Sequence, residues 1–319
     1  MNTVPKPDRI AADRIAADWI AADWIAADWG TSNLRVWAMG ATGPMAHATS
    51  DDGMGKLARA EFEPALLRLI EPWLGVGAMS VVACGMVGSR QGWHEAEYRA
   101  TPCAPLEPGA LVRVPTVDPR IVMSIVPGLK QIKPADVMRG EETQIAGALA
   151  LLPGFDGVFC LPGTHSKWVH ISAGEVVSFQ TYLTGELFAL LSEHSVLRHG
   201  MAEGGWDEAA FDQGISDGLE RPEKIGARLF TVRAEGLISG LSSAGARSRL
   251  SGLLIGAELA AAKPYWLGQH VVLVGVEALA AAYSRALASQ GLTATRLDAT
   301  ACTLAGLATA RGALRSAAE

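Results

Sequence analysis

The sequence predicts an α/β protein, and three observations lead to this fold class. First, short apolar runs typical of buried strands occur at residues 79–84, 121–126 and 271–274. Second, segments with helical character separate or follow these runs, at residues 62–74, 141–152, 183–191, 250–262 and 276–287. Third, residues 25–37 and 158–171 share one pattern, in which two apolar strands flank a Gly-Thr turn. With 319 residues, the chain is long enough for two domains or one large one.

The composition favours a protein that acts on small molecules. Only 19% of the residues are charged and the net charge is −6, which disfavours nucleic acid as a partner. Cysteines at positions 84, 103, 160 and 302 lie far apart, which argues against a disulfide framework and a zinc site and favours a reducing compartment. We find no apolar run long enough to span a membrane and no secretory signal pattern. We therefore expect a cytoplasmic protein with no membrane partner.

Residues 10–29 are a tandem pentad, Ile-Ala-Ala-Asp followed by Arg in the first copy and by Trp in the other three. A period of five keeps the isoleucines on one face of neither a strand nor a helix. Only the last copy leads into the Gly-Thr turn, so we expect the working strand to start at Ile25 and residues 1–24 to form a mobile tail. Alternatively, the copies exchange at the same sheet position, which a chain starting at Ile25 would test.

The first hairpin has a polar tip that suits a metal-nucleotide. Asp28 ends its strand, where a carboxylate can hold a hydrated divalent metal. Backbone N–H groups and side chains of the next residues can surround a phosphate; these are Gly30, Thr31, Ser32 and Asn33. Ordinary turn chemistry explains the same pattern equally well.

The second hairpin repeats this form and adds a cation. Its tip contains Gly163, Thr164, His165 and Lys167. Lys167 on a donor-rich tip is a candidate for binding a phosphate, although a lone lysine at a strand start is commonly just solvated. Between the hairpins, Glu141 and Glu142 open a helix, where the helix dipole alone favours carboxylates. The functional alternative is that one of them orients or deprotonates a substrate hydroxyl.

Further candidates follow other strands. Small residues at 85–89 permit close approach of a ligand, and Trp93, Tyr98 and Arg99 suit a sugar acid, although a surface loop also explains them. Gly275, at a strand-to-helix junction, suits a nucleotide base or a plain turn.

Several motifs together resemble the 2-dehydro-3-deoxygalactonokinase family, in order and spacing, from about residue 25 to about residue 310. They are Asp28-Trp29-Gly30-Thr31-Ser32-Asn33-Leu34-Arg35, Gly85-Met86-Val87-Gly88-Ser89, Met138-Arg139-Gly140-Glu141-Glu142-Thr143-Gln144, Pro162-Gly163-Thr164-His165-Ser166-Lys167-Trp168, Leu183-Thr184-Gly185-Glu186-Leu187 and Ser251-Gly252-Leu253-Leu254-Ile255-Gly256-Ala257-Glu258. The family belongs to the superfamily of actin-like, hexokinase-like and Hsp70-like ATPases. The resemblance therefore implies two domains of duplicated ribonuclease H-like fold, with mixed sheets flanked by helices and ATP in an interdomain cleft. It divides the chain into residues 1–24, an N-terminal actin-like ATPase domain at 25–152 and a C-terminal one at 153–319.

The resemblance also implies roles. Asp28 would lie near Mg²⁺, and Glu142 would occupy the catalytic position, with Glu141 as the alternative. The implied ATP-binding residues are Asp28, Gly30, Thr31, Ser32, Asn33, Gly163, Thr164, His165, Lys167 and Gly275. The implied substrate-binding residues are Arg35, Gly85, Met86, Gly88, Ser89, Trp93, Arg139 and Glu186. The arginine that binds the substrate carboxylate stays open among Arg35, Arg90, Arg99 and Arg139.

Two departures from the family pattern matter. Leu161-Pro162 precedes the second Gly-Thr where an aspartate is usual, which leaves the metal to Asp28 alone. Gly275-Val276-Glu277 stands where Gly-Gly or Gly-Ser is usual, which predicts a weaker purine contact.

The implied reaction is transfer of the ATP γ-phosphate to the 6-hydroxyl of 2-dehydro-3-deoxy-D-galactonate. One alternative is a phosphohydrolase of the polyphosphatase type, which Gly140-Glu141-Glu142 favours and the lack of basic surface disfavours. Another is a sugar- or nucleotide-binding relative without turnover, suggested by Val276 and Glu277. The epimer of the sugar acid stays open. So does the oligomeric state, since the small-residue helix at 253–262 can pack within one chain or in a homodimer.

Overall fold

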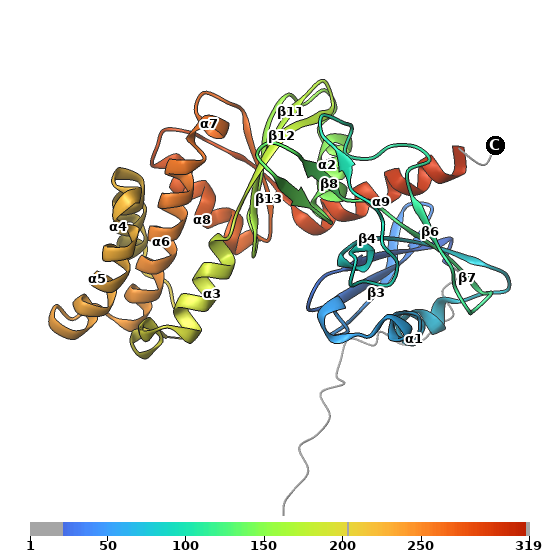
Figure 1. The fold of residues 1–319 in the computed structure, drawn as a ribbon, viewed down its shortest axis with the longest axis horizontal. Coiled ribbons are helices and arrows are strands. Elements are labelled where there is room, and N and C mark those ends of the chain that lie inside the picture. Colours follow the sequence, from blue (N-terminus) through green and yellow to red (C-terminus); the bar gives the residue numbers. More distant parts are fainter. Residues whose placement is uncertain (1–21, 203, 317–319) are drawn as a thin grey trace, which may run out of the picture. The chain divides into compact units, whose positions relative to one another are not determined.

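The computed structural model describes residues 22–202 and 204–316, and these residues form two compact units (Figure 1). Unit 1 comprises residues 22–97, 107–128 and 310–316, and unit 2 comprises 98–106 and 129–309 apart from residue 203. Residues 129–152, which the sequence analysis placed in the N-terminal domain, group with unit 2. Most of the pentad tail lies outside the described residues. No described helix is both long and apolar enough to cross a membrane.

Unit 1 is built on a six-stranded mixed sheet with the order β3-β2-β1-β4-β7-β6. The strands are β1 (Trp24–Trp29), β2 (Leu34–Gly40), β3 (Gly43–Ser50), β4 (Met79–Gly85), β6 (Val112–Val114) and β7 (Ile121–Ile125). β1 pairs antiparallel with β2 and parallel with β4, which places Asp28 opposite Arg35 on one side and Cys84 on the other. The first hairpin and the two predicted strands that follow it are confirmed.

An aromatic cluster fills the core of unit 1. The ring of Trp29, on β1, lies 5.1 Å from that of Phe62, on α1 (Phe62–Ile70), and 6.2 Å from that of Trp93. All three side chains belong to one buried apolar cluster, and Trp93 is only 8% exposed. The aromatic character of Trp93 therefore serves packing in this structure, and its position gives no support to the predicted contact with substrate.

Unit 2 repeats the sheet plan of unit 1. Its main sheet has the order β12-β11-β10-β13-β14, formed by β10 (Gly157–Leu161), β11 (Ser166–Ser172), β12 (Glu175–Tyr182), β13 (Val271–Gly275) and β14 (Thr295–Asp298). β10 pairs antiparallel with β11 and parallel with β13, as β1 does with β2 and β4. The duplicated α/β fold implied by the resemblance is confirmed. A small sheet, β5-β8-β9, adds Arg99–Ala100, Leu129–Gln131 and Asp136–Met138.

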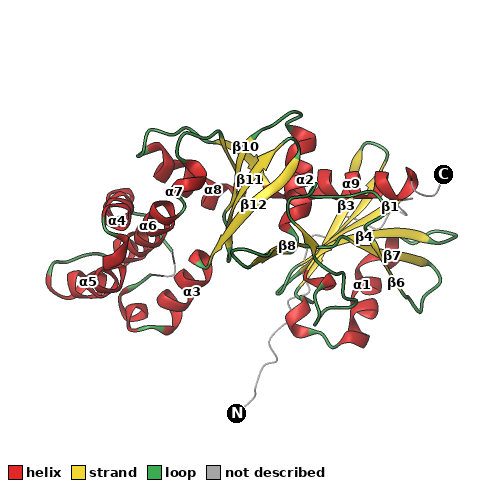
Figure 2. Ribbon diagram, turned by 45° about the horizontal axis from the view of Figure 1, so that its top comes forward, coloured by secondary structure: helices red, strands yellow, loops and turns green. Residues whose placement is uncertain are grey.

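Helices flank the strands of unit 2, and three of them, α4, α5 and α6, lie side by side (Figure 2). The described helices from residue 141 on are α2 (Glu141–Leu151), α3 (Thr184–His194), α4 (Glu208–Glu220), α5 (Ile225–Ile238), α6 (Ser243–Ala261), α7 (Lys263–Trp266), α8 (Glu277–Ala288) and α9 (Ala299–Ser316). Ile145 and Ala148 of α2 pack in the same apolar cluster as Phe159 of β10. This packing is the physical reason that α2 groups with unit 2.

Glycines allow two helix pairs to pack with their backbones almost in contact. A Cβ at Gly252 of α6 would lie 2.2 Å from the carbonyl oxygen of Phe211 in α4, closer than real Cβ atoms come. The predicted close packing of the small-residue helix is therefore confirmed within the chain. A Cβ at Gly147 of α2 would lie 1.8 Å from the carbonyl oxygen of Cys302 in α9. This second contact holds α2, the helix that begins with Glu141 and Glu142, closely against α9.

Candidate active site

The tip of the first hairpin, residues 30–33, is here called loop 1. The N–H of Gly30 donates to the carbonyl oxygen of Asn33 at 2.9 Å, and the N–H of Gly55 donates to that of Thr31 at 2.9 Å. A Cβ at Gly53 would lie 2.3 Å from the Thr31 oxygen, so glycine is required where the following segment crosses the loop. Thr31, Ser32 and Asn33 are exposed. Loop 1 thus has a backbone fixed by hydrogen bonds and side chains that a ligand can reach.

Asp28, the next-to-last residue of β1, lies beside two other predicted site residues, Arg35 and Gly85. Its carboxylate accepts a hydrogen bond from the guanidinium of Arg35, and the Cys84 Sγ lies 4.0 Å away. Gly85 has φ of 92°, and a Cβ there would lie 2.6 Å from the carbonyl oxygen of Trp29. A side chain at position 85 would therefore be strained and would collide with the backbone of β1.

Asp28 is the residue that the family resemblance assigns to Mg²⁺. The described residues contain no group of three or more His, Cys, Asp or Glu side chains arranged to hold a metal. Mg²⁺ commonly keeps several waters and takes only one or two protein carboxylates together with substrate phosphates. A single aspartate at the end of β1 fits such a site.

Residues 163–167, here called loop 2, are surrounded by an ion-pair network. The ammonium of Lys167 lies 2.8 Å from the Glu141 carboxylate and donates to the carbonyl oxygen of His165 at 3.1 Å. Lys167 is only 3% exposed. The His165 ring nitrogen lies 2.6 Å from the carboxylate of Glu186, in the first turn of α3. The structure therefore brings four predicted site residues together in unit 2, and the Lys167–Glu141 pair is a contact the sequence did not reveal.

The two adjacent carboxylates have different environments. Glu141 is partly exposed, pairs with Lys167 and accepts from the backbone N–H of Arg139 at 3.0 Å. Glu142 has no exposed surface and accepts from the N–H of Gly140 at 2.7 Å and from the Thr143 hydroxyl at 3.0 Å. Burial, reinforced by the charge of Glu141, raises the pKa of Glu142 to about 8. Direct contact between Glu142 and a substrate would therefore require the first turn of α2 to open.

The predicted sugar-binding segment follows β4. Met86 and Gly88 lie in a 3₁₀ turn (Met86–Gly88) that leads to Ser89. The Ser89 hydroxyl is buried and has no hydrogen-bond partner within residues 22–202 and 204–316. Buried polar groups are normally paired, so this hydroxyl is a candidate for a ligand contact.

The four arginine candidates also differ. Arg35 pairs with Asp28, the guanidinium of Arg139 lies 4.2 Å from the centre of the Tyr98 ring, and Arg99 donates to the carbonyl oxygen of Ala104 at 2.8 Å. The Arg90 side chain is 82% exposed, with Glu95 at 3.5 Å as a weak surface partner. Arg90 is therefore the most accessible of the four cations.

Gly275 ends β13 at the predicted adenosine position. A Cβ there would come no nearer than 3.6 Å to Pro162, an ordinary contact, so packing does not demand glycine. Val276 is exposed, and the carboxylate of Glu277 lies 2.7 Å from the guanidinium of Arg296.

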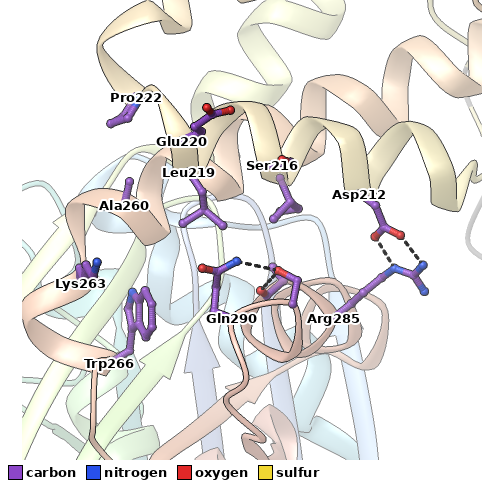
Figure 3. A pocket seen from close by; sticks show the side chains of 13 residues that line it. Asp212, Ser216, Leu219, Glu220, Pro222, Ala260, Lys263, Trp266, Arg285 and Gln290 are labelled. Atoms are coloured by element: carbon purple, nitrogen blue, oxygen red, sulfur yellow. Dashed lines mark hydrogen bonds and ion pairs between the residues drawn. The ribbon is translucent and has the colours of Figure 1, made fainter.

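A separate cavity of about 610 Å³ lies in unit 2 and contains none of the predicted site residues (Figure 3). Side chains of α4, α6, α7 and α8 line it, among them Leu219, Ala260 and Trp266. At one end, Arg285 donates to the Asp212 carboxylate at 2.6 and 2.7 Å, so its charge is already matched.

The repeated sheet plan, with a polar tip on the first hairpin of each unit, defines an α/β protein of two similar units, as the family resemblance implies. The model of the 2-keto-3-deoxy-galactonokinase family matches residues 28–310. The chain belongs to that family.

Relatives agree with this assignment. A protein of Rhizobium meliloti (strain 1021), provisionally named 2-dehydro-3-deoxygalactonokinase, is 40% identical over 293 residues, which cover 89% of this chain and 95% of the relative. The 2-dehydro-3-deoxygalactonokinase of Escherichia coli (strain K12) is 34% identical over 281 residues, 87% of this chain and 94% of the relative. A crystal structure from Sinorhizobium meliloti, provisionally described as the same enzyme, has a TM-score of 0.85 at 40% identity and covers 91% of this chain and 99% of its own.

Proposed function

We propose that this chain is an ATP-dependent sugar-acid kinase that transfers the γ-phosphate of ATP to the 6-hydroxyl of 2-dehydro-3-deoxy-D-galactonate. The observation that carries the proposal is the family match over residues 28–310. The match covers 95% and 94% of the two relatives that bear the kinase name. The free state of the four cysteines supports a location in the reducing cytoplasm.

Positioning and charge neutralisation supply most of the catalysis in phosphoryl transfer. The exposed groups of loop 1, with Thr164 and Lys167 of loop 2, would bind phosphate oxygens. Asp28 would hold Mg²⁺, which when bound neutralises charge on the phosphates. Lys167 is nearly buried, and its ammonium contacts the Glu141 carboxylate. Because an ammonium has three N–H donors, Lys167 can bind a phosphate oxygen while it keeps its contact with Glu141.

Glu142 would receive the proton of the substrate hydroxyl once the first turn of α2 opens. Its pKa of about 8 supports this role, because a general base works best when its pKa is near the working pH. Glu141, paired with Lys167, would hold that lysine in place.

Incubation of the purified protein with ATP, Mg²⁺ and a panel of 2-keto-3-deoxy sugar acids tests the proposal. We expect ADP to form only when an acceptor is present, fastest with the galactonate derivative. Phosphate release without any acceptor would instead support a phosphohydrolase. Nucleotide binding without product would support a binding protein that lacks turnover.

Replacement of Arg90 by alanine tests the partner of the substrate carboxylate. Because Arg90 is the most accessible of the four candidate arginines, we expect Arg90→Ala to raise the KM for the sugar acid about tenfold or more, with the KM for ATP unchanged. Arg113→Ala, on β6 of the same unit, is the control. Equal KM values in Arg90→Ala and the native protein would exclude Arg90 and leave Arg35, Arg99 and Arg139 as the candidates.

A further inference from the structure

Glu258 is a buried carboxylate that the proposed chemistry does not use. It lies in α6 and is 3% exposed. Burial of a carboxylate is costly unless hydrogen bonds compensate it. Three side chains donate hydrogen bonds to the Glu258 carboxylate: the Trp168 indole N–H at 2.8 Å, the Tyr283 hydroxyl at 2.6 Å and the Thr184 hydroxyl. So many directed bonds to one buried group indicate a fixed local geometry.

The donors come from both sides of loop 2. Trp168 lies on β11, immediately after the loop, and Thr184 is the first residue of α3. The hydroxyl of Ser166, a residue of loop 2 and the first residue of β11, lies 2.9 Å from the Tyr283 hydroxyl, which itself donates to Glu258. Glu258 thus links the strand that leaves loop 2 to the start of α3.

The start of α3 in turn contacts loop 2 directly. A Cβ at Gly185 would lie 2.3 Å from the carbonyl oxygen of Gly163, so the two backbones touch. The N–H of Glu186 donates to the carbonyl oxygen of Thr164 at 2.9 Å, and its carboxylate contacts His165. A shift of the first turn of α3 would therefore shift the backbone of loop 2.

We propose that Glu258 is a positioning residue that holds loop 2 and the start of α3 in register, and thereby sets the affinity of loop 2 for the phosphates of the nucleotide. The proposal rests on the proposed kinase function for the identity of the ligand. The geometric part, the order of loop 2, depends only on the contacts described above. Glu258 contacts neither Lys167 nor Glu141 through any described hydrogen bond or ion pair, so it acts on these two residues only through the position of loop 2.

Two variants and one control test this role. Glu258→Gln keeps the volume of the side chain but replaces one of its two acceptor oxygens by an amide N–H₂ donor. Thr184→Val removes only the link to α3 and leaves the bonds from Trp168 and Tyr283. Asp217→Asn is the matched control, because Asp217 is also a buried carboxylate of unit 2 and instead binds Arg249 at 2.6 Å, in the helices α4 and α6.

Hydrogen exchange on the full chain without nucleotide reports loop order. We expect amides at 163–167 and 184–187 to exchange about tenfold faster in Glu258→Gln and Thr184→Val, and at the native rate in Asp217→Asn. Calorimetric titration with ATP and Mg²⁺ should show about tenfold weaker binding in the first two variants only. The KM for the sugar acid should stay within about twofold of the native value.

Three results would overturn the proposal: native exchange rates in both Glu258→Gln and Thr184→Val, equal acceleration in Asp217→Asn, or faster exchange with unchanged ATP affinity. Failure of the kinase proposal can be told apart from failure of this one. In that case the native protein would form no product with any sugar acid, and the exchange rates would still decide whether Glu258 orders loop 2.

Discussion

Glu142→Gln is expected to lower turnover by about two to four orders of magnitude, the range typical for loss of a general base. The amide keeps the shape of the side chain and can still accept the hydrogen bond from the N–H of Gly140, so the first turn of α2 should survive. It cannot take a proton from the substrate hydroxyl. Steady-state kinetics with saturating ATP and sugar acid would measure the loss, which should fall on kcat more than on either KM.

Glu141→Gln is the matched control for this change, since it alters the adjacent carboxylate in the same turn. It should weaken the contact with Lys167 and so raise the KM for ATP, with a smaller effect on kcat. The opposite pattern, full turnover in Glu142→Gln and lost turnover in Glu141→Gln, would make Glu141 the base. Glu141 is a definite alternative as the base because its side chain is partly exposed.

The pH dependence gives a second measurement on the same residue. Burial raises the pKa of Glu142 from 4.5 to about 8, so the base form accumulates only as the pH approaches 8, and kcat should rise with pH up to that value.

The same raised pKa makes the stability of the folded state depend on pH. Between pH 4.5 and 8, Glu142 keeps a proton in the folded state that it has released in the unfolded state, so its contribution to stability is full below about pH 4.5 and is lost as the pH rises through 8. Glu142→Gln should therefore gain stability relative to the native protein over this range. Lost activity together with lost stability would indicate a folding defect instead.

The strands could be predicted from the sequence because their signal is local. The apolar runs at 79–84 and 271–274 form strands that are buried from residue 81 on in the first and throughout in the second, and each Gly-Thr turn does join two paired strands. The order of the motifs predicted the rest of the fold, because the family resemblance that they support implies two units with the same sheet plan. Asp28 and Lys167 were proposed as site residues because each lies at or next to the tip of such a hairpin.

Contacts between distant segments had no comparable signal. The pairing of Lys167 with Glu141 depends on how β11 meets α2, which neither segment encodes alone. Trp93 was expected beside the substrate because its neighbours are polar, yet its ring packs on Trp29 and Phe62. One clue was present for Glu258: a single carboxylate within the apolar run at 253–262 has to find hydrogen-bond donors if that helix is buried.

Lys167→Met is expected to raise the KM for ATP and to lower kcat/KM by about 100-fold, because the proposal gives this ammonium a charge-assisted contact with phosphate. Methionine has a similar length and no charge, so it should fill the same nearly buried space. Lys130→Met, at an exposed lysine on β8 of the same unit, should leave the kinetics unchanged.

The Lys167 variant also leaves the Glu141 carboxylate without its cation, and loss of one partner of a partly buried pair is itself disruptive. The double variant Glu141→Gln/Lys167→Met separates the two causes. If the lysine binds phosphate, the double variant should remain as defective toward ATP as Lys167→Met, because neither contains the cation. If the double variant recovered native ATP affinity, the defect of the single variant would come from the unpaired carboxylate, and loop 2 would bind phosphate through its backbone and Thr164 alone.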